Sequence, residues 1–461
     1  MARKVRDKDL TQGSIVGGLI QFSAPLLFGL IFQQLYNTVD TLVVGNYVGK
    51  EALAAVGSTT PIINTLIGIF TGFSMGATVI VSQYYGANDE KSVHEAVHTS
   101  ILMSFFFSII ITIIGLLSAP IMLRLMDTPE DVITEASAYL EIYFSGAVGL
   151  IIYNIGSGIL RAVGDSKRPL YFLIFSAVVN TVLDLVFVIA FNMGVAGVAW
   201  ATVIAQILSA ILVLIVLSRT SGSYRIYWSK LKLNKPMLKS IIKIGLPSSI
   251  QQGITAFSNV FVQSYINSFG SAFMAGYSAY GKIDAIALLP MQAIAMGCTT
   301  FVGQNIGAQK IERAKKGIKV SLLMSLAFTA VLLMPLIIFA EKAIMIFNSE
   351  PDVVYYGTLY MRFVSPFYLL SCINQVYAGA LRGSGDTRAP MIIMLGSFVV
   401  FRQIYLLAVS NIFKGNFYPI LFAYPAGWIV CSIAIYVYYR KSDWEHRSVI
   451  IRRNNSGKTE V

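Results

Sequence analysis

The stretch LRAVGDSKRP at residues 160–169 returns 221 residues later as LRGSGDTRAP at residues 381–390. The same offset carries Gly49 onto Gly270 and Gly76 onto Gly297, and it places QYYGA at 83–87 on QNIGA at 304–308. A single offset that holds over such a distance indicates an internal duplication. We therefore expect two similar lobes.

Both lobes are strongly apolar. Hydrophobic residues make up 56% of the 461 residues and charged residues 13%, whereas a typical soluble domain has about 25% charged residues. Apolar runs of about 18–25 residues recur along the chain, which is the length that a helix needs to cross a bilayer. We expect an all-α polytopic membrane protein with about twelve transmembrane helices, at 15–44, 55–82, 97–119, 136–158, 169–191, 195–217, 241–266, 272–303, 318–340, 357–379, 390–412 and 418–439.

Basic residues are distributed very unevenly over these spans. With twelve spans both termini lie on one side, and that side carries 26 of the 35 Lys and Arg residues, against 4 on the other side and 5 within the spans. Acidic residues do not segregate in this way, which is how the positive-inside rule behaves. We expect an inner (cell) membrane protein with both termini in the cytoplasm. The net charge of +12 then reflects topology and does not indicate a nucleic-acid partner.

Six spans in each lobe make a parallel repeat, since an even number returns the chain to the side on which it started. The predicted division is an N-terminal lobe at 1–217, a cytoplasmic linker at 218–240, a C-terminal lobe at 241–439 and a cytoplasmic tail at 440–461. Transporters built from such repeats bind substrate near the bilayer midplane. The three cysteines, Cys298, Cys372 and Cys431, are too scattered for a disulfide framework or a zinc ribbon.

Two acids in the N-terminal lobe are predicted to lie at the same depth. Asp40 and Asp184 each stand about seven residues before the outer end of an outward-running span, which places both about 10 Å below the boundary. Thr202 reaches this depth in the sixth span, and Asn180 lies one helical turn from Asp184. Tyr36 and Asn37 stand within one turn of Asp40, and Gln206 within one turn of Thr202, as substrate contacts or a second layer.

The first six spans contain no Lys or Arg at hydrocarbon depth. Acids at this depth could satisfy buried backbone or pair with a basic group, but a mobile cation fits better when no basic group is available. Carboxylate, amide and hydroxyl oxygens suit a small hard cation. We expect Asp40, Asn180, Asp184 and Thr202 to bind H+ or Na+.

The C-terminal lobe has a different set of charges at hydrocarbon depth: Lys282, Asp284, Arg362 and Arg402. Asp284 is expected to pair with Arg402 or another basic group on a neighbouring helix, which is a structural role. We keep Asp284 as a further candidate for the substrate-binding layer, because ionisable residues inside a membrane mark functional sites by default.

The run His94-Glu95-Ala96-Val97-His98 matches the H-E-x-x-H signature of zinc proteases. The alternative that it raises is an intramembrane metalloprotease. The only other histidine is His446, near the end of the chain, so a third ligand is missing. We expect a protein that is not an enzyme and has no cofactor.

Taken together, these residues resemble the multidrug and toxic compound extrusion (MATE) transporters. The resemblance rests on the two six-span lobes, on Pro25 followed by Asp40, on the run at 381–390 and on GQNIGA at 303–308, and it covers about residues 12–440. Asp40, Asn180, Asp184 and Thr202 look like the coupling-ion site of the DinF-like prokaryotic branch. The resemblance implies an antiporter that exports amphipathic organic cations in exchange for H+ or Na+ by alternating access.

The chain departs from the NorM-like branch, which carries acids in the seventh and tenth spans. The seventh span here has none, and the tenth offers Asn374 and Gln375 instead. A second alternative within transport is a lipid-linked sugar flippase of the same superfamily, but such proteins have a more cationic cavity. The expected partners are small organic cations and the lipid bilayer, and the expected state is a monomer.

Overall fold

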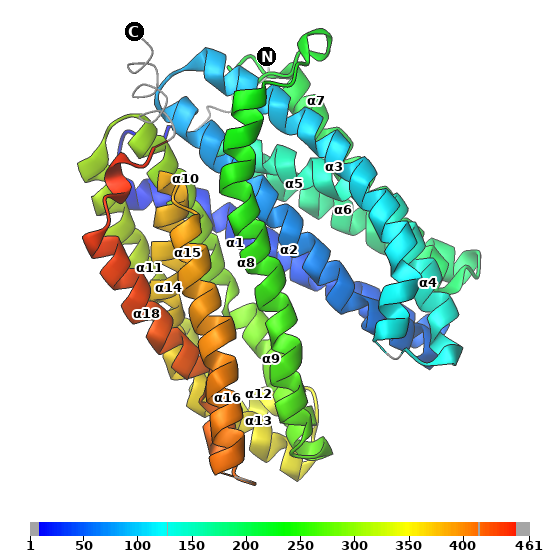
Figure 1. Cartoon of the computed structure of the whole chain (residues 1–461). Helices are drawn as coiled ribbons and strands as arrows, with labels where there is room; N and C mark the ends of the chain where they lie inside the picture. Colours follow the sequence, from blue (N-terminus) through cyan, green and yellow to red (C-terminus); the bar gives the residue numbers. More distant parts are fainter. Residues whose placement is uncertain (1–8, 127, 414, 449–461) are drawn as a thin grey trace. The chain divides into compact units, whose positions relative to one another are not determined.

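The computed structural model describes residues 9–126, 128–413 and 415–448. Within these residues the regular elements are all helices (Figure 1). Each of the twelve expected spans coincides with one helix or with consecutive helices. The first half contains α1 (Ile15–Val43), α2 (Lys50–Gly86), α3 (Glu90–Leu125), α4 (Glu130–Ser145), α5 (Ala147–Ala162), α6 (Lys167–Leu185) and α7 (Gly194–Arg219). The all-helical architecture is therefore confirmed.

The second half begins with the long helix α8 and is more often broken. Its helices are α8 (Lys235–Asn267), α9 (Ser271–Ala287), α10 (Leu289–Gly307), α11 (Ile311–Ile338), α12 (Ala340–Met345), α13 (Pro351–Val364), α14 (Tyr368–Ser384), α15 (Arg388–Leu395), α16 (Arg402–Ile412), α17 (Tyr418–Leu421) and α18 (Ala423–Lys441). Short π-helical segments are η1 (Val44–Val48), η2 (Val186–Ala190) and η5 (Gly396–Phe401), and short 3₁₀ segments are η3 (Trp228–Lys230), η4 (Ser365–Phe367) and η6 (Trp444–His446).

Nine helices in the described part of the chain are long and apolar enough to cross a membrane, and the bent pair of α4 and α5 makes a tenth. Two further spans were expected at α8 and at α13–α14. Helix α8 has 33 residues and so a length of about 50 Å, but it carries Lys, Ser and Gln side chains along its course. The chain is a multi-pass membrane protein.

By their contacts, the helices form two compact units. Among the described residues, the N-terminal unit contains those from 28 to 246, and the C-terminal unit contains those from 10 to 27 together with those from 247 to 448. Two helices are thus shared: α1 changes unit between Leu27 and Phe28, and α8 changes unit between Leu246 and Pro247. Both changes lie close to a proline inside a helix, Pro25 and Pro247, where the regular hydrogen bonding is interrupted. The predicted boundaries at 217 and 240 follow chain order and stay a prediction.

Close helix contacts in the N-terminal unit depend on small residues in α5. A Cβ atom at Gly158 would lie 2.6 Å from Ser74 Oγ and 2.7 Å from Thr78 Oγ1, both on α2. A Cβ at Gly149 would lie 2.7 Å from the backbone nitrogen of Ile207 on α7. Small residues of this kind allow helix backbones to approach one another in membrane proteins. Helix α5 therefore holds α2 and α7 in place beside it.

Glycines also allow close helix packing in the C-terminal unit. A Cβ at Gly276 of α9 would lie 2.7 Å from the backbone nitrogen of Gly357 in α13. A Cβ at Gly383 of α14 would lie 2.5 Å from the carbonyl oxygen of Thr299 in α10. The buried core around α9 and α13 is rich in aromatic side chains, among them Phe273 and Tyr360.

Candidate functional site

Asp40 of α1 and Asp184 of α6 meet inside the N-terminal unit. Their side chains are 9% and 0% exposed, and the two carboxyl groups lie within hydrogen-bonding reach of each other. Ionised carboxylates only accept hydrogen bonds, and two of them this close repel each other. The contact is therefore favourable only when a proton or another cation lies between them.

Neutral polar groups surround this pair. The Tyr36 hydroxyl lies within hydrogen-bonding reach of Asp40 and donates to Thr202 Oγ1 at 3.4 Å. Asn180 Nδ2 donates to the same Thr202 Oγ1 at 3.5 Å. Asn180 and Thr202 are 0% and 3% exposed. The structure thus brings together all four residues predicted for the coupling site, and their role remains a prediction.

Several oxygen atoms of the cluster lack a partner within the described residues. They are Asp40 Oδ1, Asn180 Oδ1 and both carboxylate oxygens of Asp184, all inaccessible to solvent. No Lys, Arg or His in the described ranges forms an ion pair with either acid. Leaving a buried charge without a partner is costly. The free oxygens provide ligands that match a small hard cation or a shared proton.

Two tyrosines of α4 complete the cluster, and the sequence reasoning missed them. Tyr139 lies within hydrogen-bonding reach of Thr202 and close enough to both acids to interact with their charges, and Tyr143 lies within reach of Gln206. Their rings are nearly parallel, with centroids 6.4 Å apart. The signal that could have found them is their i, i+4 spacing, which places both on one face of the fourth span.

Of the second-layer candidates, Asn37 stays outside the cluster. Its side chain is exposed and makes no hydrogen bond to the acids within the described residues. Asn37 is three residues before Asp40 and Tyr36 is four, and only Tyr36 lies on the face of α1 that turns toward Thr202.

A π-helical segment follows each acid. Segment η1 begins four residues after Asp40, and η2 begins two residues after Asp184. The two segments contact each other. Insertion of an extra residue per turn widens the helix and is frequent at functional sites. The last turns of α1 and α6 are thus irregular just where the two acids meet.

In the C-terminal unit the expected pairing of Asp284 with Arg402 is wrong. Tyr280 and Tyr368 both donate hydrogen bonds to Asp284 Oδ1. The Arg402 guanidinium donates instead to Ser258 Oγ at 3.0 Å and to Asn259 Oδ1 at 2.9 Å. The reason is geometric, because α8 supplies polar acceptors beside Arg402 while α14 supplies a phenol beside Asp284.

The H-E-x-x-H run binds the linker that follows α7. His98 Nε2 accepts from the backbone N–H of Tyr227 at 3.1 Å, and Glu95 Oε2 accepts from Asn234 Nδ2 at 2.8 Å. Among the residues that the structure describes, no three His, Cys, Asp or Glu side chains are grouped so that they could hold a metal ion. This arrangement favours a structural role for the motif.

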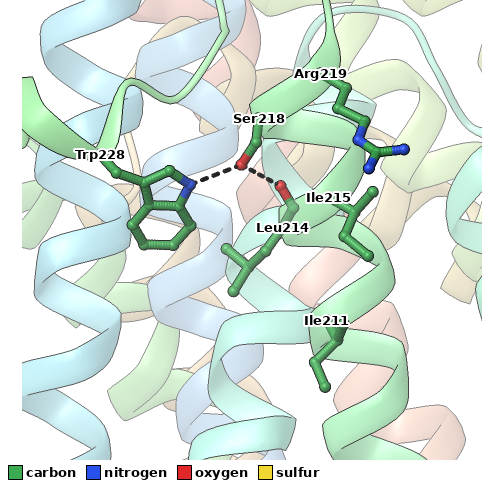
Figure 2. A pocket seen from close by; sticks show the side chains of 6 residues that line it. All are labelled: Ile211, Leu214, Ile215, Ser218, Arg219 and Trp228. Atoms are coloured by element: carbon green, nitrogen blue, oxygen red, sulfur yellow. Dashed lines mark hydrogen bonds between the residues drawn. The ribbon is translucent and has the colours of Figure 1, made fainter.

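A shallow pocket of about 310 Å³ lies where this linker folds back on the end of α7. Figure 2 shows Trp228 Nε1 donating to Ser218 Oγ at 3.0 Å, beside apolar side chains such as Ile211. Ser218 is 16 residues beyond Thr202 on the same helix, a separation of about 24 Å. The pocket is therefore not part of the acidic cluster.

Comparison with known proteins decides the family. The pattern of the MatE family matches twice, at residues 25–186 and 247–405, and the second match begins at Pro247. The chain is also 30% identical over 443 residues, 95% of its length, to “Probable multidrug resistance protein YpnP” of Bacillus subtilis, of which 97% is covered. The chain belongs to the MatE family. The predicted membership of the MATE transporters is therefore confirmed, whereas the DinF-like branch stays a prediction.

Other MatE relatives agree. “Probable multidrug resistance protein NorM” of Thermotoga maritima is 26% identical over 444 residues, which cover 94% of each chain. A solved outward-facing structure of a multidrug resistance MATE family transporter matches with a TM-score of 0.89 at 21% identity, covering 95% of this chain and 98% of that one. This last likeness confirms the fold. The MatE chain is thus a multi-pass membrane protein from a family of multidrug efflux transporters, which are not enzymes in general.

Proposed function

We propose that this protein is a secondary active antiporter that exports amphipathic organic cations across the cell membrane in exchange for H+ or Na+. The observation that carries the proposal is the contact of Asp40 with Asp184 at a buried site where the described residues offer no basic partner. Such a pair needs a cation, and membrane acids of this kind mark ion pathways and proton relays.

The arrangement suggests how the cation is held. With a proton, one carboxyl group donates to the other, and the Tyr36 hydroxyl lies within hydrogen-bonding reach of Asp40. With Na+, the free oxygens of Asp40, Asn180 and Asp184 act as ligands. In both cases the cation removes the repulsion between the two acids.

Coupling to export requires that this cation affects the rest of the molecule. Asp40 lies on α1, whose first half packs in the C-terminal unit and whose second half packs in the N-terminal unit. A change of charge at Asp40 therefore acts on a helix anchored in both units. Coupling of two binding events requires a shared element that has two arrangements, and α1 is our candidate. Alternating access follows from such a change.

The same proposal covers orientation and partners. We infer that both termini are cytoplasmic, from the concentration of Lys and Arg on their side of the predicted spans. The cluster in the N-terminal unit is acidic, which favours a cationic substrate over the anionic pyrophosphate of a lipid-linked sugar. We expect the protein to act as a monomer and without a cofactor.

The test is transport by purified protein in proteoliposomes. Tetraphenylphosphonium, a permanently charged amphipathic cation, should be moved against its gradient when a pH or Na+ gradient of the correct sign is imposed. The converse should also be seen, since adding the compound to one side should drive H+ or Na+ to the other. If neither gradient supports transport of organic cations by folded protein, the proposed function is refuted.

A further inference from the structure

Asp284 of α9 is held by phenols and by no basic group. Tyr280 and Tyr368 both donate to its Oδ1, and their hydroxyls are 2.8 Å apart. No group within the described residues donates to Oδ2. The acid is partly exposed, unlike the two tyrosines, which are 5% and 1% exposed. One oxygen is thus fixed and the other is available.

The basic residues nearest in the sequence or packed on the same cluster have other partners. The Lys282 ammonium lies 5.3 Å from the ring centre of Phe347. The Arg402 guanidinium hydrogen-bonds with Ser258 and Asn259 and stacks on Tyr424 at 4.9 Å. No ion pair forms at Asp284 within the described residues, so a negative charge on this carboxylate has no basic partner there, at a depth where this is costly.

Aromatic rings line the surroundings of the acid. Tyr277 lies 6.1 Å from Tyr280, and Trp428 lies 5.6 Å from Tyr368, between ring centres. Tyr277 and Tyr424 share a hydrogen bond of 3.1 Å between their hydroxyls. Tyr277, Tyr424 and Trp428 are partly exposed, whereas the tyrosines beneath them are buried. We call these three rings with Asp284 the aromatic rim.

The acid of the rim lies within the apolar stretch Ser271–Gly307, which α9 and α10 form together. Asp284 is 13 residues beyond Ser271, the first residue of α9, which is about 20 Å along the helix axis. This distance brings it near the middle of a hydrocarbon core about 30 Å thick, where transporters bind their substrates.

We propose that the aromatic rim binds the cationic group of the exported compound, with Asp284 as counter-charge and the rings as walls. Quaternary ammonium, phosphonium and delocalised aromatic cations are attracted by carboxylates and by aromatic faces together. The inference rests on the proposed function and deepens it. It assigns substrate to the C-terminal unit, apart from the ion at Asp40 and Asp184. Arg402 covers a face of Tyr424 and repels a second positive charge, so the rim takes one cationic group.

The test uses two probes of one shape and opposite charge, tetraphenylphosphonium and tetraphenylborate. Binding to the purified full-length protein is measured at equilibrium for wild type and for Asp284→Asn. Loss of the counter-charge should weaken phosphonium binding by about tenfold or more, as for one close ion pair, and should leave borate binding unweakened. Asp352→Asn removes one exposed charge from the first turn of α13 and should change neither affinity.

A second pair of variants keeps the test decisive if Asp284→Asn does not fold. Tyr277→Phe retains the ring but loses the hydroxyl, and it should bind phosphonium within about twofold of wild type, whereas Tyr277→Leu should bind about fivefold more weakly, since the ring supplies the attraction. Equal phosphonium affinity in wild type, Asp284→Asn and Tyr277→Leu overturns the inference, even when gradient-driven export is intact. Absence of all export by wild type, with binding that depends on Asp284, would instead refute the antiporter proposal.

Discussion

Asp40→Asn and Asp184→Asn are the substitutions that most directly test cation coupling. The amide keeps the volume of the carboxyl group and some of its hydrogen bonding, but it cannot be ionised. In a protein that exchanges one proton for one organic cation, a gradient of one pH unit sustains a concentration ratio of about tenfold. Either variant should reduce that ratio to 1, because the site that holds the exchanged proton needs both carboxyl groups.

The structure also predicts that these variants fold. Removing one member of a buried ion pair costs about 3–5 kcal/mol, since the other charge is left unpaired. Neither acid has a basic partner in the described ranges, so this cost does not arise. The variants lose only neutral hydrogen bonding to groups such as Tyr36, at about 1 kcal/mol, and gain relief from the repulsion between two acids.

The assay combines both readouts on the same preparation. Thermal unfolding in detergent should change by only a few degrees, while gradient-driven accumulation of tetraphenylphosphonium in proteoliposomes should disappear. Downhill exchange of labelled for unlabelled compound should persist, because it needs no ion. The reasoning is refuted if both variants, reconstituted to wild-type levels, still accumulate the compound against its gradient.

Three further outcomes are expected. In His98→Ala, transport should stay near the wild-type rate and insensitive to chelators. Protease should cleave the linker around Tyr227 more easily, because the backbone N–H of Tyr227 loses its acceptor. Loss of transport that zinc restores would favour the metalloprotease alternative. Gly158→Ala should destabilise the protein by about 1–3 kcal/mol through overpacking, since its Cβ would lie 2.6 Å from Ser74 Oγ. Gly57→Ala is the control, because the space around Gly57 is open, and it should not destabilise the protein. Equal melting temperatures for the two variants would contradict the packing described. Finally, an impermeant thiol reagent added to intact cells should label Asn416→Cys and not Ser229→Cys. The background should be low because the three native cysteines are buried. The opposite labelling pattern would mean that the chain has the reverse orientation in the membrane.

Depth along a helix was enough to predict the acidic cluster. The common depth of Asp40 and Asp184 follows from the constant rise per residue of a helix and from the outer ends of their spans, which are visible in the sequence. The same arithmetic does not give rotation about the helix axis with equal accuracy. Asn37 is expected beside Asp40 but is exposed, and the spacing did not single out Tyr139, which lies within hydrogen-bonding reach of Thr202.

The charged residues of the C-terminal unit show a second limit. Opposite charges in one apolar unit suggest an ion pair, and Asp284 with Arg402 was the expected one. The outcome depended on which polar groups the neighbouring helices place beside each charge. Tyr368 of α14 and Ser258 of α8 supply them, and neither contact leaves a trace in the spacing of residues.

The membrane environment, the all-helical class, the duplication and the resemblance to the family could all be predicted from the residues alone. These follow from composition, from the length of apolar runs and from a repeated pattern, all of which are local or periodic along the chain. Three features become visible only in the folded chain. Helices α1 and α8 are each shared between two packed units, the H-E-x-x-H run holds the linker, and phenols hold Asp284. These features depend on contacts between residues far apart in the chain, and such contacts are set by how helix surfaces pack together.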